Sequence, residues 1–247
     1  MSFMSIIPDN FRDVAIVDPE YGIGESGKNH KTRNTLIRQK DGHTLRRAPS
    51  GNYSRKDWDN KAAGPEYFAE LKRVTRNQII FGANYFESIY GKVEKPPRRN
   101  QYDQFLKDHP VGYIIWDKVN GNNDFSDCEV IYTSFNFPSE VIYYMWAGMM
   151  QGTSILNGTI MQGDKALNEK RIHPTQKPVI IYKYLLHRFV KPKETVLDTH
   201  GGSMSIVVAC YDYEVPITCI EKDPEYFDKS SKRIKKHARQ IKMLFPE

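Results

Sequence analysis

Three largely apolar runs that each stop abruptly at an acidic residue constrain this fold most strongly. They are Val14–Asp18, Val196–Asp198 and Ile217–Glu221. Short, nearly continuous apolar runs are typical of strands buried on both faces, which is the usual environment in a parallel sheet. An acid at the end of such a strand lies where the carboxyl edge of the sheet opens into a ligand-binding crevice. The sequence therefore predicts an α/β protein with a site at one edge of a mostly parallel sheet.

Further strand-like and helix-like segments between these runs support the same fold class. We expect paired strands at 129–133 and 141–146, a loop or linker over 91–108, and no clear element over 147–172. Alternation of strand and helix after residue 178 indicates parallel crossovers. The remaining strands are expected at 77–82, 113–118, 195–197 and 216–220, and the helices at 64–73, 178–190, 203–212 and 223–240.

The composition is that of an ordinary globular protein. Apolar residues make up 39% of the 247 residues and charged residues 27%, which allows a normal core in a single domain. No run of about 18 apolar residues occurs, so we expect no membrane span. The first residues lack the basic-then-apolar pattern of a secretory signal, so we expect a cytoplasmic protein. The three cysteines are scattered and the seven histidines form no HExxH pattern, so we expect no disulfide framework and no metal site.

Positive charge is concentrated between residues 25 and 61. The net charge is +6, and this stretch has few apolar residues and no sustained helical or strand period. It is predicted to be a long surface loop, and one interpretation is a solvated insertion. The interpretation that we favour is an arm that holds the phosphates of a nucleic acid beside the site. The candidate phosphate-binding residues are Lys28, Lys31, Arg33, Arg38, Arg46, Arg47, Arg55 and Lys56.

The two ends of the chain carry different chemistry. Near the C-terminus, a Gly-rich turn at 201–203 is followed about twenty residues later by Glu221, a spacing that suits a cofactor containing ribose. Near the N-terminus, Asp18, Pro19 and Tyr21 place a carboxylate, a carbonyl and an aromatic ring within four positions. Such a set can hold a planar ring that carries an amino group.

A rival glycine motif follows the first strand. Gly22–Gly27 fits the dinucleotide spacing G-x-G-x-x-G, and with Lys28 it approaches a phosphate-binding loop. A helix should open directly after either motif, whereas a basic loop follows here. Asn29 also stands where a phosphate-binding loop requires Ser or Thr. A nucleotide site at Gly22–Lys28 is therefore less favoured than a cofactor site at the glycine turn 201–203.

Four motifs, in order, resemble those of one enzyme family. Asp18-Pro19-Glu20-Tyr21 is similar to the D-P-P-Y motif of the amino-group DNA methyltransferases, which act on adenine N6 or cytosine N4. His173–Pro178 reads H-P-T-Q-K-P and resembles their H-P-T-x-K-P element. Asp198–Ser205 resembles their D-P-F-x-G-S-G-T loop, and Asp223–Phe227 the start of the helix after their second cofactor strand. With the catalytic motif first, the order resembles the permuted beta type, which occurs in phages and in restriction-modification systems.

The resemblance implies a Rossmann-like, circularly permuted methyltransferase fold with helices on both faces of the sheet. One domain would span 1–247, with the basic loop at 25–61 and a small target-recognition insertion within 120–172. The implied activity is site-specific methyl transfer from S-adenosylmethionine to adenine N6 of flipped bases in double-stranded DNA, by a monomer or homodimer. The implied catalytic residues are Asp18, Pro19, Glu20 and Tyr21. The implied cofactor-binding residues are Thr175, Gln176, Lys177, Asp198, His200, Gly201, Gly202, Ser203, Glu221 and Lys222.

The chain departs from the family pattern at several positions. Glu20 stands in place of the second proline, Thr199 and His200 in place of Pro and Phe, and Met204 in place of a glycine. The Met204 side chain is expected where the backbone would meet the cofactor. Two alternatives to adenine methylation stay open, namely cytosine-N4 methylation and a catalytically inactive DNA-binding relative. Asp18 at the first motif position favours adenine, since Ser at that position goes mostly with cytosine in the family.

Overall fold

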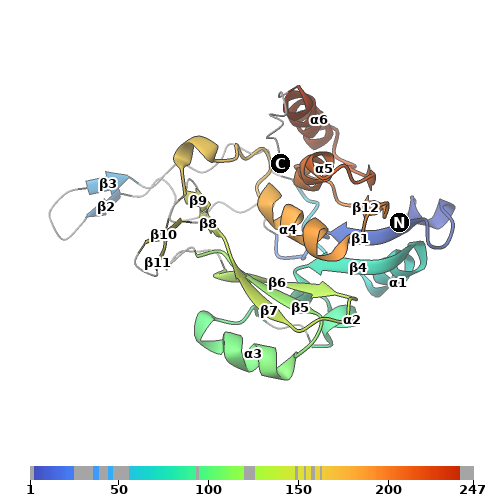
Figure 1. The fold of residues 1–247 in the computed structure, drawn as a ribbon, viewed down its shortest axis with the longest axis horizontal. Coiled ribbons are helices and arrows are strands. Elements are labelled where there is room, and N and C mark those ends of the chain that lie inside the picture. The colour runs from blue at the N-terminus through green and yellow to red at the C-terminus, as the bar shows by residue number, and fades with distance from the viewer. Residues whose placement is uncertain are drawn as a thin grey trace.

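A seven-stranded sheet lies at the centre of the molecule (Figure 1). The computed structural model describes residues 3–24, 36–38, 44–46, 56–92, 95–119, 126–147, 150–152, 154–156, 159–161 and 163–239. Within this part of the chain the strand order is β13-β12-β1-β4-β6-β5-β7. The strands are β1 (Arg12–Val17), β4 (Thr75–Phe81), β5 (Tyr113–Asp117), β6 (Cys128–Thr133), β7 (Glu140–Tyr143), β12 (Val196–Asp198) and β13 (Ile217–Cys219).

The sheet is mostly parallel, as predicted. β1 pairs in parallel with both β12 and β4, β12 pairs in parallel with β13, and β5 pairs in parallel with β7. Only β6 runs the other way in this sheet, because it is antiparallel to both of its neighbours, β4 and β5. β1 therefore lies between strands from the two ends of the chain. The carboxyl ends of β1 and β12 meet at one edge, which is where parallel sheets hold ligands.

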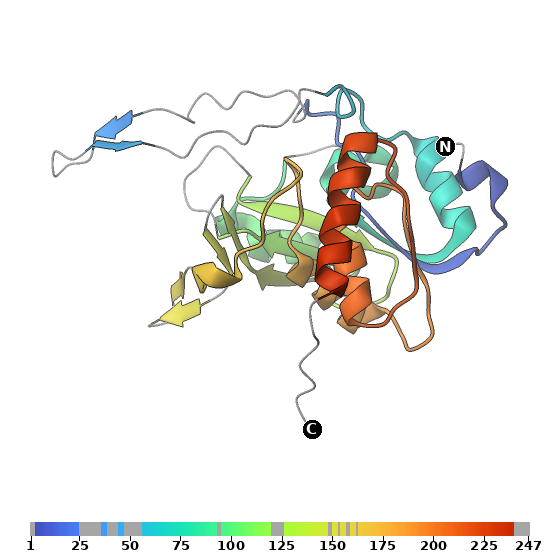
Figure 2. The same ribbon diagram turned by 90° about the horizontal axis from the view of Figure 1, so that it is seen from above.

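Helices cover both faces of the sheet, which confirms the predicted fold class. Along β1, Val14 and Ile16 pack in one core cluster with α4 and α5, whereas Ala15 and Val17 pack in another with α1. This alternation follows from the two-residue period of a strand. α6 packs against α5 (Figure 2). The helices are α1 (Pro65–Val74), α2 (Glu87–Tyr90), α3 (Tyr102–Asp108), α4 (Val179–Phe189), α5 (Ser205–Asp212) and α6 (Pro224–Ala238), with short 3-10 turns η1 (Met4–Ile6), η3 (Ala83–Tyr85), η4 (Arg99–Gln101) and η5 (Lys165–Leu167).

Three sequence-based expectations are wrong. Segments 129–133 and 141–146 do not pair with each other, because β5 lies between β6 and β7. The supposed linker over 91–108 contains η4 and α3, whose Tyr102 and Phe105 are buried in a core cluster with β5 and β6. The segment after 146 contains short antiparallel strands, each too brief to give a periodic pattern. They are β8 (Met145–Ala147) with β9 (Met150–Gly152), and β10 (Ser154–Leu156) with β11 (Thr159–Met161).

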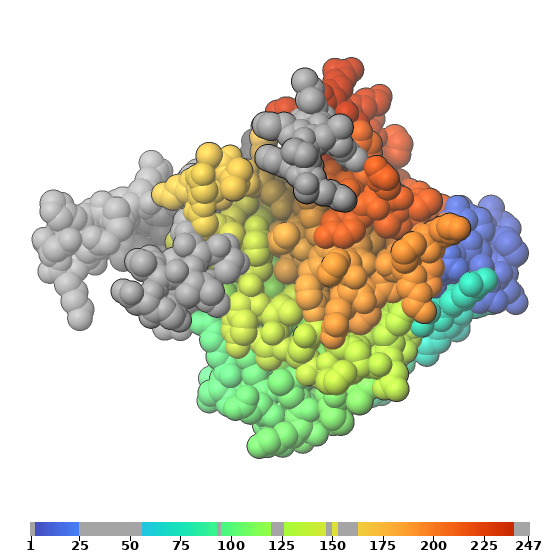
Figure 3. Space-filling view, viewed as in Figure 1, coloured from blue at the N-terminus to red at the C-terminus, as the bar shows by residue number. Residues whose placement is uncertain are grey.

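Most of the predicted basic loop lies outside the described residues. Within it, β2 (Leu36–Arg38) and β3 (Thr44–Arg46) form an antiparallel pair, which the absence of a sequence period did not predict. This pair lies apart from the main body in both ribbon views (Figures 1 and 2). In the space-filling view, α4 and α5 form a continuous surface between the β5–β7 edge and the N-terminal segment (Figure 3). No helix in the described part of the chain is long and apolar enough to cross a bilayer.

Packing of α1 on the sheet gives a direct test of the core. Leu71 is 0% exposed, whereas Leu167 in η5 is 81% exposed. We expect Leu71→Ala to lower the free energy of unfolding by about 2.7–5 kcal/mol, because it leaves a cavity between α1 and β1. Leu167→Ala is the matched control and should change it by less than about 0.5 kcal/mol. Urea denaturation measures both, and equal effects would contradict the packing of α1 described above.

Candidate active site

Two cavities meet at the carboxyl edge of the sheet. The larger has a volume of about 590 Å³ and lies over the ends of β12 and β13. The smaller, of about 300 Å³, lies over the end of β1 and beside β6. They share part of their walls, so that a group bound in one would face a group bound in the other. The shared lining residues are Asp18, Glu20, Trp58, Thr175, Gln176 and Lys177.

Glu221 shapes the larger cavity from the end of β13. One carboxylate oxygen accepts the backbone N–H of Gly202 at 2.5 Å, and the other accepts that of Asp223 at 2.7 Å. Asp223 in turn caps α6 by accepting the N–H groups of Glu225 and Tyr226. Glu221 therefore ties the glycine turn to the start of α6. The predicted cofactor residues on this wall are Thr175, Gln176, Lys177, His200, Gly201, Gly202, Ser203, Glu221 and Lys222.

Asp198 is the one predicted cofactor residue that does not line the larger cavity. It is buried beneath the turn, and its carboxylate accepts the backbone N–H of His200 at 2.9 Å. Burial raises the pKa of Asp198 to about 7. The structure therefore places Asp198 where it supports the shape of the loop.

Glycine is required where this loop approaches its neighbours. A Cβ on Gly201 would lie 2.9 Å from Cys219 Sγ and 3.1 Å from the Ile220 carbonyl oxygen, too close for another residue. Met204 adopts a left-handed conformation, with φ of 51°, that normally favours glycine. Its side chain is buried and lines neither cavity. The expectation that Met204 would stand in the way of the cofactor is therefore wrong.

The other departures from the family pattern contact one another. Glu20 bonds to His200 Nε2 at 3.0 Å and to Lys222 Nζ at 3.3 Å. Burial acts to raise the pKa of Glu20, but the hydrogen bond and the charge of His200, with smaller contributions that include the charge of Lys222, together outweigh it and lower the pKa to about 2. On the other side of His200, Tyr67 Oη lies 2.7 Å from Thr199 Oγ1 and 3.3 Å from His200 Nδ1. Glu20, Thr199 and His200 thus form one linked set across the two loops.

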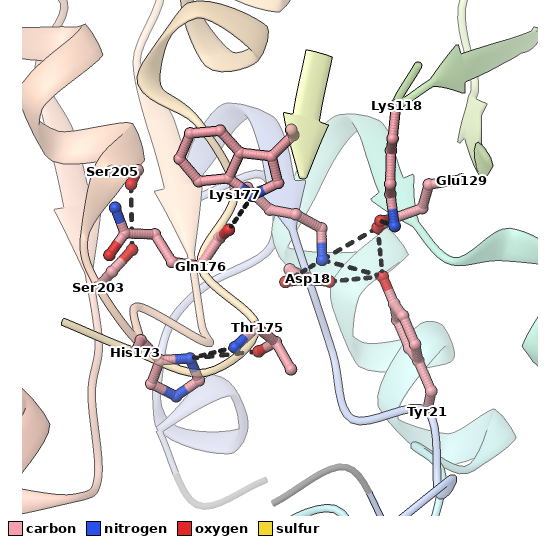
Figure 4. Close-up of polar contacts among 11 residues, drawn as sticks. Asp18, Tyr21, Lys118, Glu129, His173, Thr175, Gln176, Lys177, Ser203 and Ser205 are labelled. Atoms are coloured by element: carbon pink, nitrogen blue, oxygen red, sulfur yellow. Dashed lines mark hydrogen bonds and ion pairs between the residues drawn. The ribbon is translucent and has the colours of Figure 1, made fainter. Parts of the chain in front are cut away.

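Asp18, Tyr21, Glu129 and Lys177 form a closed ring of four side chains in mutual contact (Figure 4). Tyr21 Oη lies 2.6 Å from Asp18 Oδ1 and 2.7 Å from Glu129 Oε1. Lys177 Nζ lies 2.7 Å from Asp18 Oδ2 and 3.0 Å from Glu129 Oε1. Lys118 Nζ adds a second cation at 3.1 Å from Glu129 Oε2. Two carboxylates and two ammonium groups are thereby brought together.

The charges of this ring perturb one another. Burial raises the pKa of Asp18, the charge of Lys177 acts to lower it, and the charge of Glu129 acts to raise it further. Burial also acts to raise the pKa of Glu129, but Lys177 and Lys118 outweigh it and lower the pKa to about 2. The pKa of Lys177 is raised because its two carboxylate partners outweigh burial. Asp18 is thus the more basic of the two carboxylates.

Aromatic rings line the smaller cavity. The Tyr21 ring stacks on Tyr85 with centroids 4.8 Å apart and 14° between the ring planes. Trp116 and Trp146 also belong to the core cluster, which agrees with the interpretation of the aromatic strands as core packing, yet both reach this wall. The predicted catalytic residues Asp18, Pro19, Glu20 and Tyr21 all line the cavity. Tyr21 is directed at Asp18 rather than standing alone as a stacking platform.

The end of the basic stretch contributes to the walls of both cavities through Trp58. The Trp58 ring lies 5.3 Å from the ring of His173, centroid to centroid. Asp59 Oδ1 accepts the N–H of Gly22 at 2.9 Å, and its carbonyl oxygen accepts that of Gly24 at 2.9 Å. The chain therefore leaves and returns at the rim of the site. Lys56, predicted to bind phosphate, pairs with Asp223 at 2.9 Å and with Glu225 at 3.1 Å.

The other predicted phosphate-binding residues cannot be placed at this site. Arg38 and Arg46 lie in β2 and β3, away from the body, with side chains outside the described set. Lys28, Lys31, Arg33, Arg47 and Arg55 lie outside the described residues.

Several lining residues were missed from the sequence. Glu129 is an acid inside an apolar strand. This pattern indicates a buried charge with a partner, so the sequence could have predicted it. Trp58 gave no signal, because it lies in a polar segment whose return to the site is a property of the fold. The missed residues also include Tyr67, His173, Tyr226, Asn84, Tyr85, Lys118 and Arg171.

The C-terminal part of the chain matches a known family model. Residues 146–232, which are 87 of the 247, match the model N6_N4_Mtase, described as DNA methylase. The matched segment includes the His173–Pro178 element, the glycine turn and the start of α6. It confirms the resemblance that was predicted from the motifs.

Three solved structures have similarities that span most of the chain. M1.HpyAVI in complex with SAM is 19% identical, with 91% of this chain and 90% of that chain covered, at a TM-score of 0.44. The PvuII DNA methyltransferase, described as cytosine-N4-specific, is 12% identical, with 93% of this chain and 82% of that chain covered, at a TM-score of 0.45. The putative DNA modification methylase TTHA0409 from Thermus thermophilus, complexed with S-adenosyl-L-methionine, is 12% identical. The match covers 97% of this chain and 92% of that chain, at a TM-score of 0.44.

The contact of Gly82 with Tyr21 gives a test of the ring geometry. A Cβ at Gly82 would lie 2.3 Å from Tyr21 Cε1 and Cζ, whereas one at Gly24 would meet nothing within 4 Å, although both glycines have φ of +66°. Gly24→Ala should therefore cost only the backbone strain of about 1–2 kcal/mol. Gly82→Ala should cost about 1–3 kcal/mol more, because the Tyr21 ring must move. Urea denaturation compares the two, and equal costs would mean that Tyr21 does not pack on Gly82.

Proposed function

We propose that this chain, whose residues 146–232 match the amino-group DNA methylases, is an S-adenosylmethionine-dependent DNA methyltransferase that modifies adenine N6. The observation that carries the proposal is the junction of the two cavities at Asp18. The larger cavity falls in the size range of small-molecule sites. The smaller one, walled by aromatic rings and a carboxylate, suits a single base that has left the duplex.

The residues of the larger cavity fit a nucleoside cofactor that carries a charged amino-acid part. Among the described side chains, Trp58 Nε1 is a buried donor without a hydrogen-bond partner, and Trp58 lines the cavity. Buried donors without partners are costly, so a ligand with acceptor oxygens or nitrogens would stabilise them. Glu221 keeps further lone pairs for ribose hydroxyls at the end of β13. When bound, S-adenosylmethionine supplies an electrophilic methyl group.

Asp18 and its neighbours account for activation of the target amine. The amine of adenine is a poor nucleophile, because its lone pair is delocalised into the ring. Asp18 and the carbonyl of Pro19 line the smaller cavity and can accept the two N–H groups. Accepting both favours tetrahedral nitrogen, and positioning of the amine toward the larger cavity supplies most of the rate gain.

The preference for adenine rests on the chemistry of Asp18. A carboxylate forms charge-assisted hydrogen bonds, roughly twice as strong as neutral ones, which suits a weakly reactive amine. The resemblance also pairs Asp at this position mostly with adenine. The test is methylation of unmethylated duplex DNA, followed by digestion and mass spectrometry of the nucleosides. N6-methyladenine is expected, N4-methylcytosine alone would reassign the base, and no methylation would favour an inactive DNA-binding relative.

Double-stranded DNA is the proposed partner. A base inside a duplex cannot reach a recessed carboxylate, so it must be flipped out. The basic stretch 25–61 supplies cations for the phosphates, and its two ends lie at the rim of the smaller cavity. Because phosphate contacts are independent of sequence, this stretch positions the DNA and does not choose the site.

Removing the Asp18 carboxylate separates chemistry from cofactor binding. We expect Asp18→Ala to abolish methyl transfer, because the amine loses its charged acceptor. The dissociation constant of S-adenosylmethionine should change by less than about threefold, because the anchors of the cofactor lie on β12 and β13. Calorimetry and a radiolabelled methyl-transfer assay give the two quantities. Parallel loss of binding and transfer would contradict the assignment of Asp18 to the substrate side.

Removing the Glu221 carboxylate should have the converse effect. We expect Glu221→Ala to weaken S-adenosylmethionine binding by about 1–3 kcal/mol, because both the turn at Gly202 and the ribose lose a partly buried acceptor. Glu194→Ala is the control, since this acid bonds the nearby N–H of Lys191 in a turn outside both cavities. An unchanged dissociation constant for Glu221→Ala would mean that the ribose is held elsewhere.

A further inference from the structure

We propose that Glu129 is a positioning residue that draws the Tyr21 hydroxyl and the Lys177 ammonium away from Asp18, leaving Asp18 Oδ1 able to accept the target amine. The inference rests on the proposed function and deepens it. It concerns a strand, β6, that contributes nothing to the recognised motifs. Glu129 is 5% exposed, so its charge must be held by the partners inside the protein.

The geometry makes Glu129 a direct competitor of Asp18. Tyr21 Oη lies 2.6 Å from Asp18 Oδ1 and 2.7 Å from Glu129 Oε1. Lys177 Nζ lies 2.7 Å from Asp18 Oδ2 and 3.0 Å from Glu129 Oε1. The same Glu129 oxygen therefore stands beside both groups that stabilise the Asp18 anion (Figure 4).

A tyrosine hydroxyl has one proton, so Tyr21 can donate only one hydrogen bond at a time. Tyr21 can donate to Asp18 or to Glu129, but not to both at once. When it donates to Glu129, Asp18 Oδ1 is relieved of one donor and can accept an N–H of the base in the smaller cavity. Rotation of the hydroxyl proton alone makes this exchange, so the Tyr21 ring can stay stacked on Tyr85.

The charges favour the same division of roles. Glu129 also holds Lys118, whose ammonium lies 3.1 Å from Oε2, the oxygen opposite the one that Tyr21 and Lys177 share. With two cations beside it, Glu129 stays ionised and acts as a fixed acceptor, its pKa lowered to about 2. Burial raises the pKa of Asp18, and the negative charge of Glu129 adds to that effect. Asp18 is thereby kept as the proton acceptor of the pair.

The reaction then balances without any further group. The amine nitrogen forms a bond to the methyl carbon as the sulfonium–methyl bond breaks, and that electron pair remains on sulfur. The nitrogen, now positively charged, loses a proton to Asp18 Oδ1. Glu129 binds no proton in the step and does not touch the reacting atoms.

Other charged and titratable groups also influence Asp18, and none of them is substituted in the test. They come from the elements packed around the end of β1 and include the tyrosines of α1 and α4 and the acid of β12. The groups are Tyr21, Tyr67, Lys177, Tyr182 and Asp198.

The experiment compares wild-type protein with Glu129→Gln and Glu129→Asp. Asp18 is titrated directly by carboxyl carbon NMR, with its signal assigned from Asp18→Asn. In Glu129→Gln the amide keeps the volume but lacks the charge, so Lys177 and Tyr21 turn to Asp18, and its pKa should fall. Glu129→Asp keeps the charge further from both donors and should give a smaller fall. An Asp18 pKa that is unchanged or raised in both variants overturns the inference.

Kinetics give the functional readout. In Glu129→Gln, kcat should fall about tenfold or more, because a weaker base accepts the proton less readily. The acid limb of the pH–rate profile should move to lower pH, and KM for S-adenosylmethionine should stay within about twofold. A purely structural role would lower activity without moving the limb. If the wild type transfers no methyl group, the proposed function fails, and the NMR titration still decides the role of Glu129.

Glu140→Gln is the matched control. Glu140 is a carboxylate in the same sheet that also accepts a tyrosine hydroxyl, that of Tyr184, but it lines neither cavity. This variant should leave both the Asp18 titration and the pH–rate profile unchanged. A shift as large as that of Glu129→Gln would mean that any neutralised acid in the sheet has the same effect, which would also overturn the inference.

Discussion

The ion pair between Lys177 and Asp18 is the contact on which the site depends. It joins residues 159 positions apart in the chain, at a distance of 2.7 Å. Lys177 is buried, and an ammonium removed from water costs several kcal/mol unless carboxylates compensate it. Asp18 at the end of β1 and Glu129 in β6 both supply that compensation, so Lys177 keeps a carboxylate partner when either one is removed. Because the segment 173–178 forms part of both cavity walls, the same electrostatic requirement that seats Lys177 also brings the two cavities together.

The departures from the family pattern are coupled in the same way. A proline side chain at position 20 could not accept a hydrogen bond, and a phenylalanine side chain at position 200 could not donate one. Here Glu20 and His200 bond across the gap between the loops after β1 and β12, and Tyr67 supports His200 from α1. Substitutions that compensate each other in space favour a site that has been retuned and argue against decay. Met204 fits the same account, since its left-handed backbone carries a side chain that packs inside the core.

The sequence predicted what is local and missed what depends on pairing at a distance. Parallel strands that end in acids are visible because apolar runs and their end residues are adjacent, so β1, β12 and β13 were placed correctly. Partner choice is not local: β6 and β7 are successive strands, yet both pair with β5. α3 was missed because two buried aromatic residues anchor a helix of otherwise polar composition. Nine of the ten predicted cofactor residues line the larger cavity, but the sequence could not show that Glu129 faces Asp18 from an antiparallel strand.

The charge pattern of the sequence also overstates how many basic side chains are available to contact phosphates. Lys56 belongs to the most basic stretch of the chain, yet the fold gives it two acidic partners at the start of α6. That pairing has a positional consequence, because it holds the returning chain, with Trp58, against the wall that the cavities share. The bonds of Gly22 and Gly24 to Asp59 hold the departing chain at the same rim. The described residues on either side of the stretch 25–55 are thus both held at the rim of the cavities that Asp18 lines. Lys56 acts as an anchor for the segment, which leaves the proposed phosphate contacts to the basic residues before it.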